Sequence, residues 1–512
     1  MDSQVKQFLT DGMQHLLRNE EVQEVELFAA KNGLLTSRIN YTSHLPCNGL
    51  EEPKSTQTQG IGLRVALKED TSIKVGFGQE TGSFSMDALE SAFLKAKQGA
   101  VSDPDFNGLP DPSEEEERTL RDYHDQRLLS LTDHDLVSIG WKSIYAALEE
   151  WDKSSLVKKY SLDDLGLILG GDVTILQEEI ALVSTRLETV QEDTSTLLFS
   201  SLTAMVEKTN SKGSGGSAGT HLDDFDGTAG KMAVQSALKA AGGKEIDSGT
   251  YPVVLAPQAV ADIVNNVLIP SLRLDSFYAG NSTFQGNLGK KITSELLSVY
   301  DHGCKKGLAA SKGITCEGLP TGRTELIKAG KLSGLLASDY ETKRILKDEK
   351  AREKLGVDPT AFKKAIVPRN GFRFGHGGGR NHDTIPSISP TNVIIEGEKA
   401  LSLEDLLRTV KNGVYIGRIW YTYPINGIKA ADFTATIVGD SYLIKDGQLT
   451  DPLKPNTVRI NDNIHSVFNN LTGIENRQTG IVLWAADEVI YAPHIALSEL
   501  KMSHIAEFTQ TL

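Results

Sequence analysis

The chain has 512 residues, a hydrophobic fraction of 39% and a formal net charge of −15 at pH 7. A chain of this length can bury a large core and is expected to divide into two or three domains. A surface that binds nucleic acid needs clustered Lys and Arg, and no such cluster stands out here, so the acidic balance argues against nucleic acid as a partner.

The sequence also argues against a membrane protein. No apolar run approaches the length that crosses a bilayer, and the N-terminus opens into an amphipathic helix (Val5, Phe8) in place of a signal peptide. The three cysteines, Cys47, Cys304 and Cys316, form no disulfide framework. We therefore expect a soluble, cytoplasmic protein without a membrane partner.

The first part of the chain has the pattern of a compact α/β domain, which we place at residues 1–212. A hairpin is predicted from Ile61–Leu67 to Ile73–Phe77, and Ser85 is a good cap for the helix that follows. A second amphipathic helix starts near His134.

Two segments have the composition of connecting regions. Residues 101–130 are rich in proline and include the acidic run Glu114–Glu117, which is typical of a solvated linker or insertion. The Gly/Ser tract Ser211–Gly219 has the composition of a flexible loop. We place the domain boundary there, followed by a β-rich C-terminal domain over residues 220–512, which gives a mixed α+β fold class.

The second domain is organised around residues 249–272. Tyr251–Ala256 is predicted as a short buried strand, and Pro257 stands where a helix can begin. The apolar residues from Val260 to Leu268 follow the spacing of an amphipathic helix, which Pro270 ends.

Several segments of the second half stand in a specific order and at specific distances. They are Gly249–Pro257, the hairpin Gly318–Leu335, Asn412–Arg418, Ala431–Thr434 and Tyr442–Gly447. Taken together they resemble the TldD/PmbA family, peptidase-like proteins once called modulators of DNA gyrase. The resemblance covers the second half well and the first half only by the order of elements. It implies a two-domain α/β protein that acts in dimers.

The resemblance also implies that a metal site has been lost. Metal-binding members of the family carry His-Glu-x-x-x-His on the helix after Pro257, and the matching positions here hold Asn265, Asn266 and Ile269. An amide is a poor zinc ligand and a sec-butyl group is none. The third ligand of the family is a cysteine near the C-terminus, whereas this chain has none after Cys316. We therefore expect no metal, no other cofactor and no catalytic residue.

By these residues the chain resembles the metal-free PmbA (TldE) type of subunit. Its stretches Trp420–Thr422 and Ile481–Trp484 are nearer to the metal-bearing type. In the family, a metal-bearing subunit pairs with a metal-free one to degrade unfolded peptides and to trim leader peptides in microcin maturation.

Two functions follow as hypotheses. In the first, the chain is a non-catalytic subunit that pairs with a metal-bearing TldD-like subunit, or with itself, and holds a peptide by backbone hydrogen bonds to an exposed strand. In the second, it is a stand-alone homodimeric enzyme that acts on peptides or peptide-derived small substrates through groups outside the lost motif. The helix offers only Asp262 as a titratable group near Asn265 and Asn266, which favours the first hypothesis.

A serine hydrolase is a weaker alternative. Gly215–Gly219 matches G-x-S-x-G around Ser217, and His376–Gly379 matches an oxyanion loop. That mechanism needs the serine on a sharp turn between a strand and a helix, whereas Ser217 lies in the Gly/Ser tract. We favour a flexible loop.

Two further clusters are candidate sites. His302, Cys304 and Cys316 have side chains that suit zinc, but their spacing matches no common metal motif, and unrelated residues are favoured. The candidate pocket residues are His376, Arg380 and His382. They lie in or next to a glycine-rich run whose backbone amides could form an anion nest, and the alternative is a mobile loop.

Overall fold

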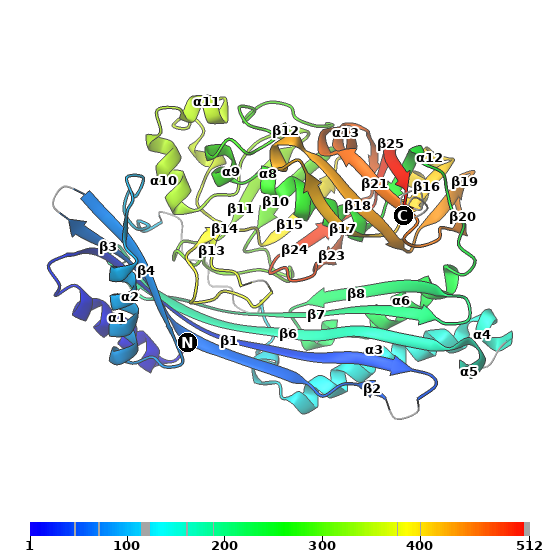
Figure 1. The fold of residues 1–512 in the computed structure, drawn as a ribbon, viewed down its shortest axis with the longest axis horizontal. Helices are drawn as coiled ribbons and strands as arrows, with labels where there is room; N and C mark the ends of the chain where they lie inside the picture. The colour runs from blue at the N-terminus through cyan, green and yellow to red at the C-terminus, as the bar shows by residue number, and fades with distance from the viewer. Residues whose placement is uncertain are drawn as a thin grey trace, which may run out of the picture.

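The computed structural model describes residues 1–512 except 46–47, 70–71, 114–122, 160–161, 188, 376, 400 and 506–512. Cys47 therefore lies outside the described residues. The described chain forms two stacked parts: a long twisted sheet with its helices, and above it a part built from three further sheets (Figure 1). The elements confirm the mixed α/β fold class expected from the sequence.

The first sheet has eight strands in the order β5-β4-β3-β1-β6-β7-β8, with β2 paired to β1. Its longest strand is β1 (Val22–Thr42), which pairs antiparallel with β3 on one side and β6 on the other. The predicted hairpin is confirmed as β3 (Lys54–Glu69) and β4 (Ser72–Thr81). The other strands are β2 (Gly49–Leu50), β5 (Val101–Ser102), β6 (Leu167–Ser184), β7 (Gln191–Val206) and β8 (Ser211–Gly219).

Helices pack at the two ends of this sheet and bury two separate apolar cores (Figure 1). Leu9 and Phe93 lie in the first core, and Trp151 lies fully buried in the second. Ser85 caps its helix as predicted, since its hydroxyl accepts a hydrogen bond from the Ala88 N–H. The helices are α1 (Ser3–Leu16), α2 (Met86–Gln98), η1 (Gln126–Ser130), α3 (Asp133–Lys153), α4 (Ser155–Lys159), α5 (Leu162–Leu165), η2 (Leu222–Asp224) and α6 (Thr228–Lys239).

The Gly/Ser tract Ser211–Gly219 is a strand, so the prediction of a flexible loop is wrong. It forms β8, which pairs with β7 along its whole length. The glycines are explained by α6: a Cβ at Gly213 would lie 2.1 Å from the Ala237 nitrogen, and one at Gly215 would lie 2.0 Å from the Ala229 oxygen. Only glycine lets this helix lie so close to the strand.

The position of β8 shows where the chain leaves the first sheet. The segment at which we expected the first domain to end is the edge strand of the first sheet, and α6 packs on that strand. The chain leaves this sheet only beyond α6, before β9 (Gly249–Leu255) joins another. Ser217 lies within the strand, with its hydroxyl 2.9 Å from the Ser200 hydroxyl, so it has none of the geometry of a catalytic serine on a sharp turn.

The second part contains a six-stranded sheet in the order β12-β11-β10-β15-β24-β23, and a nine-stranded sheet in the order β17-β18-β21-β25-β9-β16-β19-β20, with β22 paired to β25. The first comprises β10 (Leu297–His302), β11 (Arg323–Lys328), β12 (Lys331–Leu332), β15 (Asn392–Gly397), β23 (Thr479–Ile481) and β24 (Val489–Ala492). The second comprises β9 and β16 (Gly413–Ile416), β17 (Arg418–Ile425), β18 (Asp432–Gly439), β19 (Tyr442–Lys445), β20 (Gln448–Pro452), β21 (Val458–Asn463), β22 (Leu471–Ile474) and β25 (Ile495–His504). A small pair, β13 (Gly371–Phe372) and β14 (Ser387–Ile388), completes the strands.

The predicted strand and helix after Gly249 are confirmed at the centre of this part. Val260, Val264 and Leu268 are all at most 1% exposed and belong to the largest apolar core. Among the helices here, α12 begins with a capping box of Ser402 and Asp405. The helices are α7 (Pro257–Ile263), η3 (Val264–Leu268), α8 (Ile269–Ser271), α9 (Leu274–Tyr278), α10 (Asp339–Lys347), α11 (Ala351–Leu355), η4 (Lys363–Ala365), α12 (Leu403–Val410), η5 (Ile428–Ala430) and α13 (Ile464–Asn469).

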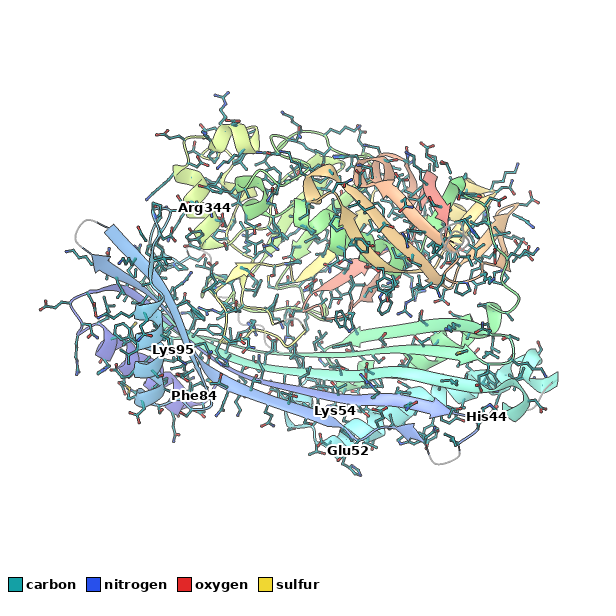
Figure 2. All side chains as sticks on the ribbon, in the orientation of Figure 1. His44, Glu52, Lys54, Phe84, Lys95 and Arg344 are labelled. Carbon is teal, nitrogen blue, oxygen red and sulfur yellow. The ribbon has the colours of Figure 1, made fainter. Side chains whose placement is uncertain are left out.

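The described part of the expected linker lies between the two halves of the molecule. Leu109 is 1% exposed, and its carbonyl accepts a hydrogen bond of 2.6 Å from the Lys343 ammonium on α10. Arg344, labelled in Figure 2, lies on the same helix and pairs with Asp105 at 3.3 Å. These residues therefore join the halves and do not extend into solvent. The acidic run Glu114–Glu117 lies outside the described residues.

Candidate functional site

The helix expected to carry the lost metal motif changes its winding at the motif. α7 passes directly into η3, a π-helical turn in which the Ile269 N–H bonds to the Val264 carbonyl, five residues earlier. A π-turn brings residues five apart onto one face of the helix. The two histidines in His-Glu-x-x-x-His are likewise five residues apart.

The position assigned to the second histidine needs a correction of one residue. Counted from Asn265, the motif ends at Pro270 and not at Ile269. Ile269 is 3% exposed and packs in the apolar core. The chemical conclusion is unchanged, because a proline ring offers no metal donor. The residues Asn265, Asn266 and Pro270 do not fit a zinc ion.

Asn266 is committed to an acid on its own helix. Its Nδ2 donates to the Asp262 carboxyl at 2.5 Å and to the Asp262 carbonyl at 3.0 Å. Gln258 approaches the other carboxyl oxygen of Asp262 at 3.4 Å. Burial raises the pKa of Asp262 to about 6, although these amides and the charge of Arg418 favour the ionised form. The helix therefore holds a buried acid that titrates near neutral pH.

Asn265 is committed in the same way to Glu488, which precedes β24. Burial raises the pKa of Glu488, and the hydrogen bond from the Asn265 side chain partly offsets this effect. The two amides at the motif positions thus hold two acids, the buried Asp262 and the half-buried Glu488. The hydrogen-bonding groups of the two amides are therefore satisfied within the chain, unlike those of imidazoles that face an open metal site.

The glycine-rich run near residue 376 does form an anion nest, and the chain itself fills it. The N–H groups of Gly377 and Gly379 donate to the two oxygens of Asp487 at 2.8 and 2.7 Å. Asp487 is next to Glu488, so the run and the motif helix are joined through this acidic pair. The nest is therefore closed to an outside anion. His376 lies outside the described residues.

Arg380 and His382 do not line an open pocket. Arg380 is fully buried and pairs with Asp193 on β7 at 2.7 Å and with Glu178 on β6 at 3.2 Å. His382 is 3% exposed, and its Nε2 lies 2.9 Å from the Thr81 hydroxyl. Burial lowers the pKa of His382. Both side chains therefore hold the second part of the molecule against the first sheet.

The three candidate zinc residues are not brought together. The Sγ of Cys304 lies 4.0 Å from the Nδ1 of His302. Cys316 lies in a separate apolar cluster with Phe28 and Phe372, where burial raises its pKa to about 12. In the part of the chain that the structure describes, no group of three or more His, Cys, Asp or Glu side chains is placed to hold a metal ion.

An exposed edge strand lies beside the motif helix. β17 is at the end of its sheet and packs against α7 and η3. Its large side chains are unusually exposed: Tyr421 is 70%, Tyr423 52% and Trp420 40% exposed. At Ile419 the Gln258 amide takes the place of a neighbouring strand, because it accepts from the Ile419 N–H at 3.0 Å and donates to the carbonyl at 3.2 Å.

Three residues of the site, Asp487, Glu488 and Arg418, are absent from the sequence-based candidates. Glu488 and Asp487 form an acidic pair in an otherwise apolar stretch between Ile481 and Ala492, and that pattern was a usable signal. Arg418 had no such signal, because its environment depends on elements far apart in the sequence.

The described residues include no helix that is long and apolar enough to cross a bilayer.

Comparison with known proteins places these features in a family. Residues 248–504 match the family model described as the PmbA/TldA metallopeptidase C-terminal domain. A metalloprotease TldD homolog of Buchnera aphidicola is 23% identical over 470 residues, covering 86% of this chain and 87% of that protein. A second TldD homolog, from Haemophilus influenzae, is 25% identical over 308 residues, which are 57% of each chain.

The fold has a solved counterpart. The crystal structure of TldE from Thermococcus kodakarensis covers 96% of this chain and all of its own, with a TM-score of 0.74 at 20% identity. The family model spans half of the chain and coincides with the part that holds the motif helix, the edge strand and the acidic pair. This chain therefore belongs to the PmbA/TldD family of metallopeptidase-like proteins.

Proposed function

We propose that this chain is a metal-free, non-catalytic subunit that binds an unfolded or leader peptide for cleavage by a metal-bearing relative. Two amides and a proline occupy the motif positions, and Asn265 and Asn266 are engaged by Glu488 and Asp262. Side chains committed to these acids are not available to a metal. The chemistry of the helix therefore supports a binding role.

The observation that carries the proposal is the position of β17. An edge strand presents unpaired N–H and C=O groups, to which an extended peptide can add as a further strand. The free edge of β17 lies beside the helix on which metal-bearing relatives carry their motif. Gln258 already makes strand-like hydrogen bonds to the backbone of Ile419 on this edge. Backbone pairing gives affinity with little sequence preference, and the exposed Tyr421 and Tyr423 add apolar contact area.

The proposed partner is a metal-bearing TldD-like chain, with a second copy of this chain as the alternative. This chain is similar in sequence to relatives named as TldD metalloproteases and in fold to TldE, which are two types of chain. A subunit that holds a peptide without cutting it needs a catalytic partner, which supports the mixed dimer.

A stand-alone enzyme is the second candidate, and Asp262 is the observation that favours it. A carboxyl whose pKa burial raises to about 6 can exchange a proton near neutral pH, and this one lies beside the exposed strand. It is 9% exposed and bonded to Asn266, which places it less well for attack on a substrate.

The test combines metal analysis, mass in solution and peptide cleavage on the purified chain, with and without a co-expressed metal-bearing family member. We expect the chain alone to be metal-free and inert while binding a labelled unfolded peptide, and cleavage to appear with the partner. Asp262→Asn should leave cleavage by the mixture intact. Stoichiometric metal in the chain alone, or cleavage by the chain alone that Asp262→Asn abolishes, would overturn the proposal.

A further inference from the structure

Arg418, at the first position of β17, has an environment that is incomplete within this chain. It is partly buried, its Nε has no hydrogen-bond partner, and it forms no ion pair with another described residue. Its guanidinium carbon lies 5.3 Å from the centre of the Trp420 ring, whose side chain is 40% exposed. A buried guanidinium nitrogen without a partner is costly, and such groups commonly bind a ligand or an ordered water.

The nearby acids do not supply that partner. One carboxyl oxygen of Asp440 accepts a hydrogen bond of 2.7 Å from the Ser214 hydroxyl, and the other oxygen has no partner. Asp262 is held by Asn266 on the motif helix. The negative charges of both acids raise the pKa of Arg418, but burial lowers it by more, so the pKa lies below its usual value. The guanidinium is thus flanked by two acids and bonded to neither.

Gln258 fixes where a strand added to β17 must stop. Its amide occupies both backbone groups of Ile419. The register of β17 against β18 also shifts between Trp420 and Tyr423, where Tyr421 has a φ of 54°. A strand added to the later residues of β17 therefore cannot continue past Ile419. The ligand chain therefore ends beside Arg418. A positive side chain at that place selects the carboxylate end of a peptide and disfavours the ammonium end.

We infer that Arg418 binds the C-terminal carboxylate of a peptide that lies antiparallel to β17, with its last residue next to Ile419. This inference rests on the proposed function, namely that β17 binds a peptide. It adds the direction of the peptide and its register on the strand. It also specifies the class of ligand, which is a peptide whose C-terminus lies where its pairing with β17 ends. A planar guanidinium can hold a carboxylate by two parallel hydrogen bonds.

The test measures binding of one apolar peptide, labelled at its N-terminus, to the full-length chain by fluorescence anisotropy. The peptide is prepared in three forms: with a free C-terminal carboxylate, with a C-terminal amide, and with a C-terminal amide plus an internal glutamate. We expect the free acid to bind about tenfold more tightly than both amides. Arg418→Gln should abolish this preference, and Arg418→Lys should retain part of it. The control is Arg459→Gln, which removes the same charge from an exposed position on β21 of the same sheet.

The outcomes separate this inference from the proposed function. If the acid and the amide bind equally to the wild-type chain, the role of Arg418 is refuted while peptide binding stands. If the internal glutamate restores the affinity of the amide, the carboxylate comes from a side chain and the assignment of the C-terminus is wrong. If no form binds, the proposed function fails together with the inference. The comparison of peptides on the wild-type chain does not depend on the folding of any variant.

Discussion

Asp262 is the buried acid that most directly links the electrostatics of the motif helix to the stability of the protein. We predict that Asp262→Asn stabilises the chain at pH 8 and that the gain shrinks as the pH falls towards 5. The carboxyl is 9% exposed, and burial raises its pKa from 3.8 to about 6. An acid whose pKa is higher in the folded state than in the unfolded state is disfavoured in its ionised form. Its cost is therefore fully present above pH 6 and disappears as the pH falls from 6 towards 3.8.

The magnitude follows from the size of this change. One pKa unit corresponds to about 1.4 kcal/mol, so the ionised carboxylate costs the folded state about 3 kcal/mol at pH 8 and about half of that at pH 5. Asparagine removes this cost. Its side chain has only one oxygen to accept hydrogen bonds from Gln258 and Asn266, and the loss of one of these bonds lowers stability by about 1 kcal/mol. The expected net gain is about 2 kcal/mol at pH 8 and under about 1 kcal/mol at pH 5.

Thermal unfolding followed by intrinsic fluorescence at several pH values measures this difference. A net gain of about 2 kcal/mol corresponds to a rise of roughly 5 °C in Tm for a unit of this size. The exposed Asp446 supplies a matched control, since Asp446→Asn makes the same change without burial. A gain that is absent at pH 8, or equal at pH 5 and pH 8, would refute the assignment of a raised pKa to Asp262.

Three further predictions concern packing, the nest and the edge strand. Gly215→Ala should lower the free energy of unfolding by about 3 kcal/mol in chemical denaturation, because its Cβ would lie 2.0 Å from the Ala229 oxygen on α6. Gly216→Ala is the control: its Cβ meets only one atom, at 3.4 Å, so the change should be nearly neutral. Asp487→Ala leaves the buried N–H of Gly379 and the half-buried N–H of Gly377 without an acceptor. Hydrogen exchange at Gly377 should therefore accelerate and stability should fall by about 1–3 kcal/mol, whereas unchanged exchange would show that the nest does not need this acid. Tyr423→Lys, at a side chain 52% exposed, should weaken peptide binding several-fold with Tm unchanged, and full retention of binding would exclude β17 as the peptide strand.

The local elements of the second part were predictable because their signals are contained in short stretches of sequence. The strand before Pro257 and the helix after it follow from apolar spacing and from the conformational restriction of proline. The capping boxes and caps follow from hydroxyl and carboxyl side chains that bond to backbone groups within a few residues. The loss of the metal chemistry is likewise visible at Asn265 and Asn266, since the identity of a side chain alone decides whether it can bind zinc.

The winding of the motif helix was not predictable in the same way. A π-turn differs from an α-helix by a single backbone hydrogen bond, here from Ile269 to Val264, and the apolar spacing of the helix does not report it. The position of the second motif residue, by contrast, follows from the sequence alone, since counting six residues from Asn265 gives Pro270 and not Ile269.

The fold class, the family and the absence of metal ligands from the motif positions could all be derived without the structure. The tertiary structure alone decided the role of the glycine-rich segments. Ser211–Gly219 is a strand because α6 approaches it, and the nest at Gly377 is closed because Asp487 reaches it from 110 residues away. It also decided that Arg380 joins the two halves through Glu178. The physical reason is that glycine and buried charges carry no local preference strong enough to fix a structure, so their state is set by whichever distant residue packs against them.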